Sequence, residues 1–271
     1  VETNVINNEV IAYTLGDIKG NDTSILTVKA KDTANFNGLA GSLAGGLTAG
    51  VGATVSTNTV TSTVLAYIGS GANQQINVGD IIVNATGVQN FNDLLSTGFA
   101  AGQGSATATV LVNDIDTLVK AYVCDNSNIK SDSLSINAEG ITTITEDIIG
   151  GAGGLYVAVG SSVGVNSIKN IVEAYTGNNV KINTKTANIK ANTTANLGKE
   201  DDKLVVVAAA GAAGAAVGAG LKNVIENEVY SYIGNNNEII STGNIDLLAQ
   251  ADTNIYESVG GGAAGIAGIG A

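Results

Sequence analysis

The sequence predicts an all-β protein, a parallel β-helix (a β-solenoid of right-handed sense) built from five repeats of about 54 residues. Three observations predict this fold: a motif returns five times, the 271 residues contain no proline, and aromatic residues make up only 4% of the chain. In stacked parallel strands nearly every backbone N–H donates to the next coil, and proline lacks that donor. Small and β-branched residues also suit a core of thin repeated layers.

The repeat is clearest when the chain is aligned on a tyrosine that returns every 53 to 57 residues. An asparagine stands nine residues before each tyrosine, and a valine stands three residues before it. These structural repeat positions are Asn4, Asn58, Asn113, Asn166 and Asn223; Val10, Val64, Val119, Val172 and Val229; and Tyr13, Tyr67, Tyr122, Tyr175 and Tyr232. We expect 1–271 to be a single repetitive segment, internal to a longer chain, with repeats at about 1–54, 55–108, 109–161, 162–218 and 219–271.

Each repeat contains three kinds of segment in a constant order. The stretch from the asparagine to the tyrosine alternates apolar and polar residues, which predicts a strand, and a turn rich in Gly and Asn follows it. A second alternating strand ends in alanine, at Leu26–Ala30, Ile81–Ala85, Leu134–Ala138, Ala187–Ala191 and Ile245–Ala249. A tract rich in Gly and Ala completes the repeat, at Gly38–Ala53, Gly98–Ala108, Gly150–Gly164, Val207–Gly220 and Gly260–Ala271.

The length of the repeat leaves the number of coils open. Fifty-four residues suit two coils of about 27 residues or three of about 18, and we favour two. Two coils per repeat predict about ten coils, an axis of about 48 Å, and equivalent asparagines about 9.5 Å apart. The asparagines then either stack as an internal ladder, which the second coil interrupts, or serve as turn residues. The valines three residues before each tyrosine are expected in the core.

Composition excludes several classes of function. The chain has no His, Arg, Met or Trp, and its 24 acidic residues against 12 basic ones give a net charge of −12. A histidine-based triad, a histidine-ligated metal and an arginine clamp for phosphate are therefore excluded, and an acidic chain repels nucleic acids. We expect no cofactor and no nucleic-acid partner. The single cysteine, Cys124, provides no disulfide scaffold and stands in a turn position that other copies fill with glycine.

Several acidic and polar groups are candidate sites, and solvated or structural roles are favoured for all of them. Asp114 and Asp116 share one strand face, and Glu200-Asp201-Asp202 form a short acidic run, but these acids do not recur in the other repeats. Catalysis with paired carboxylates is thus disfavoured, and no catalytic residue is assigned. The turns Asp125-Asn126-Ser127-Asn128 and Gly20-Asn21-Asp22 are weak calcium candidates, and no metal ligand is assigned.

Three surface features leave alternatives open. The tyrosines are expected to form a packing column with their hydroxyls at the surface, with a solvent-facing row that contacts sugars or proteins as the alternative. The threonines of Thr54–Thr63 alternate as on ice-binding solenoids, but in one copy only. The uncharged Leu204–Leu221 is long enough for a membrane-spanning helix, yet the same stretch of the second repeat, 102–107, is polar. We therefore expect no membrane insertion, while an alanine-rich helix remains an alternative there.

The repeat motif Asn-x-Ile/Val-x3-Val-x-Ala-Tyr-x-Gly, as in Asn58–Gly69 and Asn166–Gly177, joined to Gly/Ala tracts, resembles the repeat regions of large secreted leukotoxin-like filamentous adhesins of anaerobic bacteria. More broadly the chain is similar to the β-helical shafts of autotransporters and filamentous haemagglutinins. The resemblance covers all five copies. It implies a structural and adhesive shaft segment, not an enzyme, that is secreted or displayed on the bacterial cell surface.

The resemblance also implies partners. A host-cell receptor or glycan would be bound through other parts of the parent protein. The Gly/Ala tracts favour self-association, either end to end or through their faces. Two alternatives stay open: a self-assembling extracellular fibre subunit, and a carbohydrate-active β-helix enzyme.

Overall fold

The computed structural model describes residues 1–69, 73–200, 202–265 and 267–269. These residues form strands and turns and no helix, so the alanine-rich stretch after Lys203 is extended. The strands are β1 (Glu2–Thr14), β2 (Ile18–Lys19), β3 (Ile25–Phe36), β4 (Leu39–Gly45), β5 (Ala49–Ile68), β6 (Gln75–Asn77), β7 (Asp80–Val123), β8 (Asn128–Lys130), β9 (Ser133–Thr176), β10 (Lys181–Thr184), β11 (Thr186–Leu197), β12 (Lys203–Ala210), β13 (Gly214–Ile233), β14 (Glu238–Ser241), β15 (Ile245–Ile255), β16 (Ser258–Ala264) and β17 (Ala267–Ile269).

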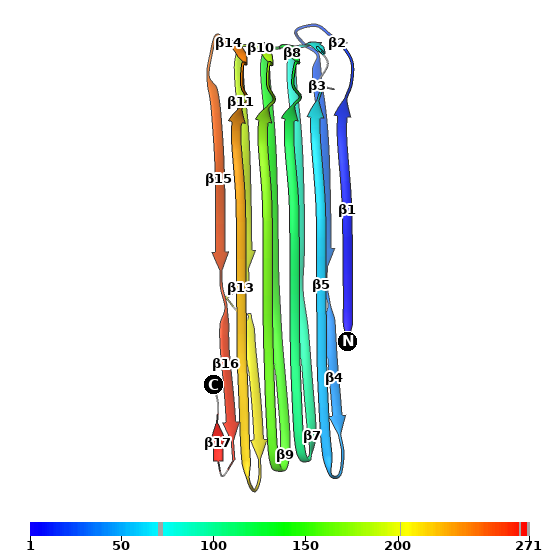
Figure 1. Cartoon of the computed structure of the whole chain (residues 1–271), viewed down its shortest axis with the longest axis vertical. Coiled ribbons are helices and arrows are strands. Elements are labelled where there is room, and N and C mark those ends of the chain that lie inside the picture. The colour runs from blue at the N-terminus through cyan, green and yellow to red at the C-terminus, as the bar shows by residue number, and fades with distance from the viewer. Residues whose placement is uncertain (70–72, 201, 266, 270–271) are drawn as a thin grey trace.

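The strands form a flat solenoid of two long layers (Figure 1). The chain runs down one layer through β3 and β4, the first half of β7 and of β9, β11–β12 and β15–β16. It returns up the other layer through β1, β5, the second half of β7 and of β9, and β13. Every pairing is parallel. A small sheet in the order β14-β10-β8-β6-β2 closes the end opposite the bend.

Each repeat makes one coil, so the prediction of two coils per repeat is wrong. The register pairs Asn58 with Asn113, and Asn113 with Asn166, as direct neighbours across adjacent strands. Equivalent residues are therefore separated by one strand spacing of about 4.8 Å, and the five strands of a layer span only about 19 Å rather than 48 Å. The alternation of inward and outward residues continues through the Gly/Ala tracts, as in β7 and β9. These tracts therefore prolong the strands, and each layer extends across the whole width of the molecule.

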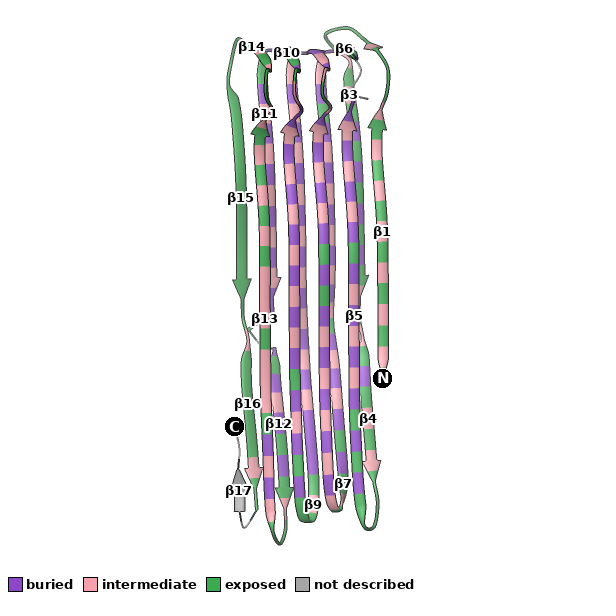
Figure 2. Ribbon diagram, in the orientation of Figure 1, coloured by how far each residue is buried: buried purple, intermediate pink, exposed green. Residues whose placement is uncertain are grey.

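The core lies between the layers and has three parts. Near the small sheet, valine and isoleucine from both layers interlock, and the predicted core residues Val64, Val119 and Val172 are fully buried there. The middle cluster contains Phe91, Leu111 and Ile144. The third cluster, toward the bend, consists of alanine and valine only. In Figure 2 buried and partly exposed residues alternate along the central strands, while β15 at the edge is exposed along its length.

The Gly/Ala tracts bring the two layers close together near the bend. A methyl group added at Gly52 would lie 2.9 Å from the backbone oxygen of Phe99, and one at Gly102 would lie 2.9 Å from the backbone nitrogen of Gly50. Both distances are shorter than real Cβ contacts. Glycine is therefore required at these positions by the close approach of the backbones rather than by an unusual φ angle.

Candidate functional site

The five repeat tyrosines form a ladder on the outer face of the ascending layer. Their rings stack nearly parallel, with centroids 5.3 Å apart for Tyr13–Tyr67 and 4.8 Å apart for Tyr175–Tyr232. Because each ring face is covered by its neighbour, the inner rings offer only edges and hydroxyls to a partner, which does not suit stacking on sugar rings. Burial raises the pKa of Tyr122 to about 12 and raises that of Tyr175 further.

The five repeat asparagines form a second ladder, inside the solenoid. Each side-chain amide donates to the side-chain oxygen of the next asparagine, over 3.0 Å from Asn4 to Asn58, 2.9 Å from Asn58 to Asn113, 2.8 Å from Asn113 to Asn166 and 2.9 Å from Asn166 to Asn223. The ladder is continuous because each repeat is a single coil. Of the two sequence interpretations of these asparagines, the structure supports the ladder. Turn asparagines with positive φ exist at other positions: Asn73, Asn126, Asn179 and Asn236.

A buried carboxylate faces this ladder from the opposite layer. The Oε2 atom of Glu146 accepts a hydrogen bond of 2.8 Å from Asn113, and its Oε1 atom accepts one of 2.9 Å from Asn166. Burial raises the pKa of Glu146 to about 7, although the amide donors act in the opposite direction. The interior of the solenoid thus holds a carboxyl group whose pKa burial shifts toward neutral pH.

Glu146 belongs to a column of three acids along the descending layer. Lys203 pairs with Asp147 and with Ser258, so the preceding residues Glu146, Asp202 and Glu257 occupy equivalent places in successive coils. Burial raises the pKa of Glu257 to about 8, and the neighbouring acids raise it as well. Burial also raises the pKa of Asp202.

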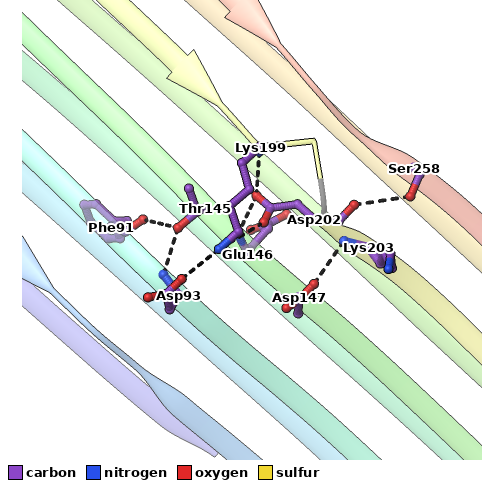
Figure 3. A network of polar contacts seen from close by, with 9 residues as sticks. All are labelled: Phe91, Asp93, Thr145, Glu146, Asp147, Lys199, Asp202, Lys203 and Ser258. Atoms are coloured by element: carbon purple, nitrogen blue, oxygen red, sulfur yellow. Dashed lines mark hydrogen bonds and ion pairs between the residues drawn. The ribbon is translucent and has the colours of Figure 1, made fainter.

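Asp202 has a structural role at the turn before β12. Its Oδ2 atom accepts hydrogen bonds from the backbone nitrogens of Lys199 and Glu146, at 2.9 and 3.1 Å. Figure 3 shows Lys199 above this turn, where its ammonium group reaches Asp93 at 2.9 Å and Asp202 at 3.8 Å. Within the part of the chain that the structure describes, no group of three or more acidic or sulfur side chains is arranged to hold a metal ion.

A second internal carboxylate, Asp32, lies closer to the small sheet. It accepts hydrogen bonds from Asn8 at 2.9 Å, Ser62 at 2.6 Å and Gln89 at 3.0 Å. These donors come from both layers, so Asp32 ties the first two coils together across the interior. Its partners satisfy the carboxylate and leave it 6% exposed.

The candidate groups named from the sequence are not brought together. Asp114 and Asp116 are exposed on the outer face of β7. In the acidic run, Asp201 lies outside the described residues, and Asp202 serves the turn described above. Burial raises the pKa of the Cys124 thiol to about 11, which disfavours a reactive thiolate.

The polar side chains of both calcium candidates are engaged in hydrogen bonds, within the first turn and to the next coil in the second. The Oδ1 atom of Asn21 accepts from the backbone nitrogen of Thr23 at 3.0 Å, and Oδ1 of Asp125 accepts from that of Asn178 at 2.6 Å. Thr57 and Thr59 belong to a threonine row that faces outward from β5 alone. In the Gly- and Asn-rich turn that follows Tyr67, residues 70–72 lie outside the described part of the chain, as do residues 266, 270 and 271 of the last Gly/Ala tract.

The sequence reasoning missed Glu146 and Asp32. The sequence does contain a signal for Glu146. It alternates in phase with Ile144 and Ile148, which are buried, whereas an acid that faces solvent would stand at the neighbouring positions 145 or 147. An acid at an inward position of an alternating strand predicts an internal polar partner. The asparagine ladder is that partner.

Comparison with protein-family models, with curated proteins and with solved structures found no match to this chain. Among the described residues, no helix is long and apolar enough to cross a membrane.

Proposed function

We propose that this segment is a repetitive structural module of a secreted or cell-surface bacterial protein, a shaft segment of the kind found in filamentous adhesins and leukotoxin-like proteins, with no enzymatic role. The observation that carries the proposal is the continuity of two side-chain ladders through five coils. Tyr122 contacts Tyr67 and Tyr175 in the same way, and Asn113 contacts Asn58 and Asn166 in the same way. A structure of this kind grows by one coil per repeat without new types of contact.

The shape of the coil indicates what the module presents. One repeat of about 54 residues advances the stack by a single strand spacing of about 4.8 Å, whereas a coil of about 18 residues would advance it equally. The chain therefore builds width rather than length. Broad outer faces are useful for adhesive contact. We infer that the repeat is long because it provides these faces, and not only because it extends the shaft along its axis. We further take the solenoid to be right-handed, because parallel crossover connections almost always are.

A specific observation also favours the alternative of a self-assembling fibre subunit. In β15 the inward-facing residues Leu247 and Ile255, equivalent to the buried Ile189 and Leu197, are 44% and 52% exposed because no further ascending strand covers them. Such an open edge accepts another coil, either from the same chain or from a second copy. Coverage by a copy of β1 would continue both ladders in register.

The excision of one repeat tests the structural proposal. Residues 1–112 joined directly to 166–271 keep every ladder in register, because Asn113 and Asn166 occupy the same place in adjacent coils. The shortened protein is expected to fold cooperatively, and small-angle scattering should show one dimension shorter by about 4.8 Å with the other two unchanged. The control is a deletion of equal length whose ends are not at equivalent positions of two repeats. A modular stack would be contradicted if the excision left all three dimensions unchanged, or if the excised protein unfolded while the control folded.

A further inference from the structure

Charge is segregated across the width of the solenoid. The half of each coil that carries the bend has no charged residue, and we call this half the wing: residues 38–57, 95–112, 148–165, 204–221 and 258–265. The boundary lies at one level on both layers, since Gly164 of the ascending layer faces Glu146 and Ile148 of the descending layer. All charged residues that the structure describes lie at or above this boundary, and the net charge of the sequence is −12.

The outer surface of the wing is strongly apolar on both faces and at the bend. Exposed residues on the descending face include Leu43 (87%) and Val207 (51%), and on the ascending face Val51 (73%). At the bend Leu47 is 93% exposed and Leu155 is 54% exposed. Soluble proteins rarely expose contiguous apolar surface of this extent without a partner.

The interior of the wing is more polar than its exterior in the second coil. Ser105, Thr107 and Thr109 point inward, are buried, and their hydroxyls have no hydrogen-bond partner among the described residues. The outward residues between and beside them are alanine and valine, as at Val110. This arrangement inverts the usual preference of a strand for apolar residues inside and polar residues outside. Apolar-out and polar-in alternation is the pattern of strands that face hydrocarbon.

A groove runs across the descending face of the wing, with a volume of about 640 Å³. Leu43, Phe99 and Val207 line it, and Gly151 lies in register between Phe99 and Val207, where the Phe99 ring packs into the space that a side chain at 151 would fill. The remaining lining is alanine and glycine. The groove has the chemistry of a site for a hydrocarbon chain.

We propose that the wing inserts into the acyl-chain region of a lipid bilayer, with the charged half remaining in water. From Ile148 to the bend at Gly154 the descending strand covers seven residues, or about 20 Å. That depth exceeds one leaflet, which is half of a hydrocarbon core of about 30 Å. In the inner coils of the wing the backbone groups are paired within the parallel ladders, as insertion into hydrocarbon demands. Among the described residues, β4 and the start of β5 at one end of the stack and β16 at the other have a neighbouring strand on one side only, so a further coil is needed to cover each of these edges. Insertion of this kind requires no helix, so it differs from the spanning segment that the sequence of Leu204–Leu221 suggests and that its strands rule out.

A fluid hydrocarbon phase fits the wing better than a second copy does. A protein partner with a flat surface covers only one face of the wing. A second protein molecule on the descending face would therefore leave Val51, on the ascending face, and Leu155, at the bend, in water. Acyl chains surround both faces and the bend at once. The inference depends on the wing alone and goes beyond the role of the repeats as a shaft.

The charge of the other half restricts which lipid surface is suitable. A net charge of −12 just above the boundary is repelled by anionic head groups. Zwitterionic surfaces lack this repulsion. Phosphatidylcholine vesicles are therefore the expected target, and addition of phosphatidylserine should weaken binding at low ionic strength.

Vesicle flotation with the 271-residue segment tests the proposal through matched variants. Leu43→Glu with Val51→Glu places two charges on opposite faces of the wing, whereas Ile11→Glu with Ile25→Glu places two charges on exposed positions of the charged half of the same edge coil. Both double variants change the net charge equally. The wing variant is expected to lose at least about tenfold in partitioning to phosphatidylcholine, and the control less than about twofold.

A tryptophan reporter distinguishes insertion from self-association, since the chain has no tryptophan of its own. Leu155→Trp at the bend should shift its emission to the blue and be quenched by brominated lipid when vesicles are added, while Ile25→Trp should show neither effect. The proposal is overturned if the segment does not float with phosphatidylcholine, if both double variants bind alike, or if the Leu155→Trp emission shifts without lipid as protein concentration rises. The last outcome would assign the wing to contacts between copies.

Discussion

The carboxylate of Glu146 accepts a 2.8 Å hydrogen bond from the side-chain amide of Asn113, across the interior between the two layers. Asn113 thereby joins the ladder along the solenoid axis to the contact between the layers. Neither residue is more than 3% exposed. Asn113 also accepts a hydrogen bond from Asn58 and donates one to Asn166, so the pair is a sensitive point for tests of the fold.

Replacement of Asn113 by alanine should be strongly destabilising. The change removes the acceptor for Asn58 and the donors for Asn166 and Glu146, and leaves buried polar atoms unsatisfied. We expect a loss of about 2–4 kcal/mol in the free energy of unfolding. The matched control is Asn90→Ala, which removes an exposed hydrogen bond to Asn35 and should cost less than about 0.5 kcal/mol. Urea titrations of both variants measure the difference, and equal costs would show that the internal ladder adds no stability.

Stability should fall as pH rises through the range set by Glu146. Burial raises its pKa to about 7 from an ordinary value near 4.5, so between these values the folded state retains a proton that the unfolded state releases. Unfolding then becomes easier with increasing pH, by up to about 3 kcal/mol for this group. Denaturant midpoints between pH 4.5 and 8 measure the slope.

The variant Glu146→Gln should flatten the part of this slope below pH 7, because glutamine does not titrate. Glu257, with its pKa raised to about 8, would continue to contribute to the slope between its ordinary value near 4.5 and about pH 8, so the slope is reduced in Glu146→Gln and not abolished. A slope that is unchanged in Glu146→Gln would mean that another group carries the pH dependence.

Introduction of a charge at Val119 should open the stack. Val119 is completely buried, and an aspartate there has no partner for its charge. We expect Val119→Asp to lose cooperative unfolding, and Val119→Ala to remain folded with a loss of about 1–3 kcal/mol. Leu118→Asp, one residue away and facing outward, is the control for an aspartate in the same strand. Circular dichroism during thermal unfolding separates the three, and a stable Val119→Asp protein would reverse the assigned phase of the strand.

The stacked tyrosines should contribute packing rather than hydrogen bonding. Tyr122 lies between two rings with centroids 4.9 Å away on each side. Tyr122→Phe preserves the stack and should be nearly neutral, while Tyr122→Ala should cost about 1–2 kcal/mol. Thermal unfolding gives both values, and a large cost for the phenylalanine variant would indicate a hydrogen bond of the hydroxyl instead.

The isolated segment should associate end to end in a concentration-dependent manner. Exposed inward residues of β15, such as Leu247, favour coverage by the first coil of a second copy. Leu247→Lys at this edge should reduce association, whereas Leu155→Glu, in the wing but on the inner strand β9, should leave edge-mediated association intact. Sedimentation velocity over a wide concentration range distinguishes the two surfaces. A monomer at every concentration would count against the fibre subunit.

Several features followed from the sequence because they depend on local pattern. The five-fold motif and the absence of proline predicted stacked parallel strands, and the structure is all-β with parallel pairing throughout the described residues. Alternation placed Val64 and Val172 in the core. Period-two alternation determines which side of a strand a residue faces whatever the coil dimensions are, so burial was predictable residue by residue.

The dimensions of the coil depended on tertiary structure. A 54-residue repeat can fold into one coil or two with the same local alternation. Only the pairing of Asn58 with Asn113 shows that each repeat completes a single coil. The reason is that the bends are small glycine-rich turns that resemble the interior of the Gly/Ala tracts in composition, so their places are set by packing between layers.

The sequence by itself therefore determined the repeat, the strand phase and the identity of the ladder residues, since these reside in spacing along the chain. Tertiary structure alone decided that Glu146 meets Asn113 and that the uncharged tracts gather into one apolar wing. These relationships join residues that are tens of positions apart in the chain, and their geometry depends on how far each strand runs before it bends.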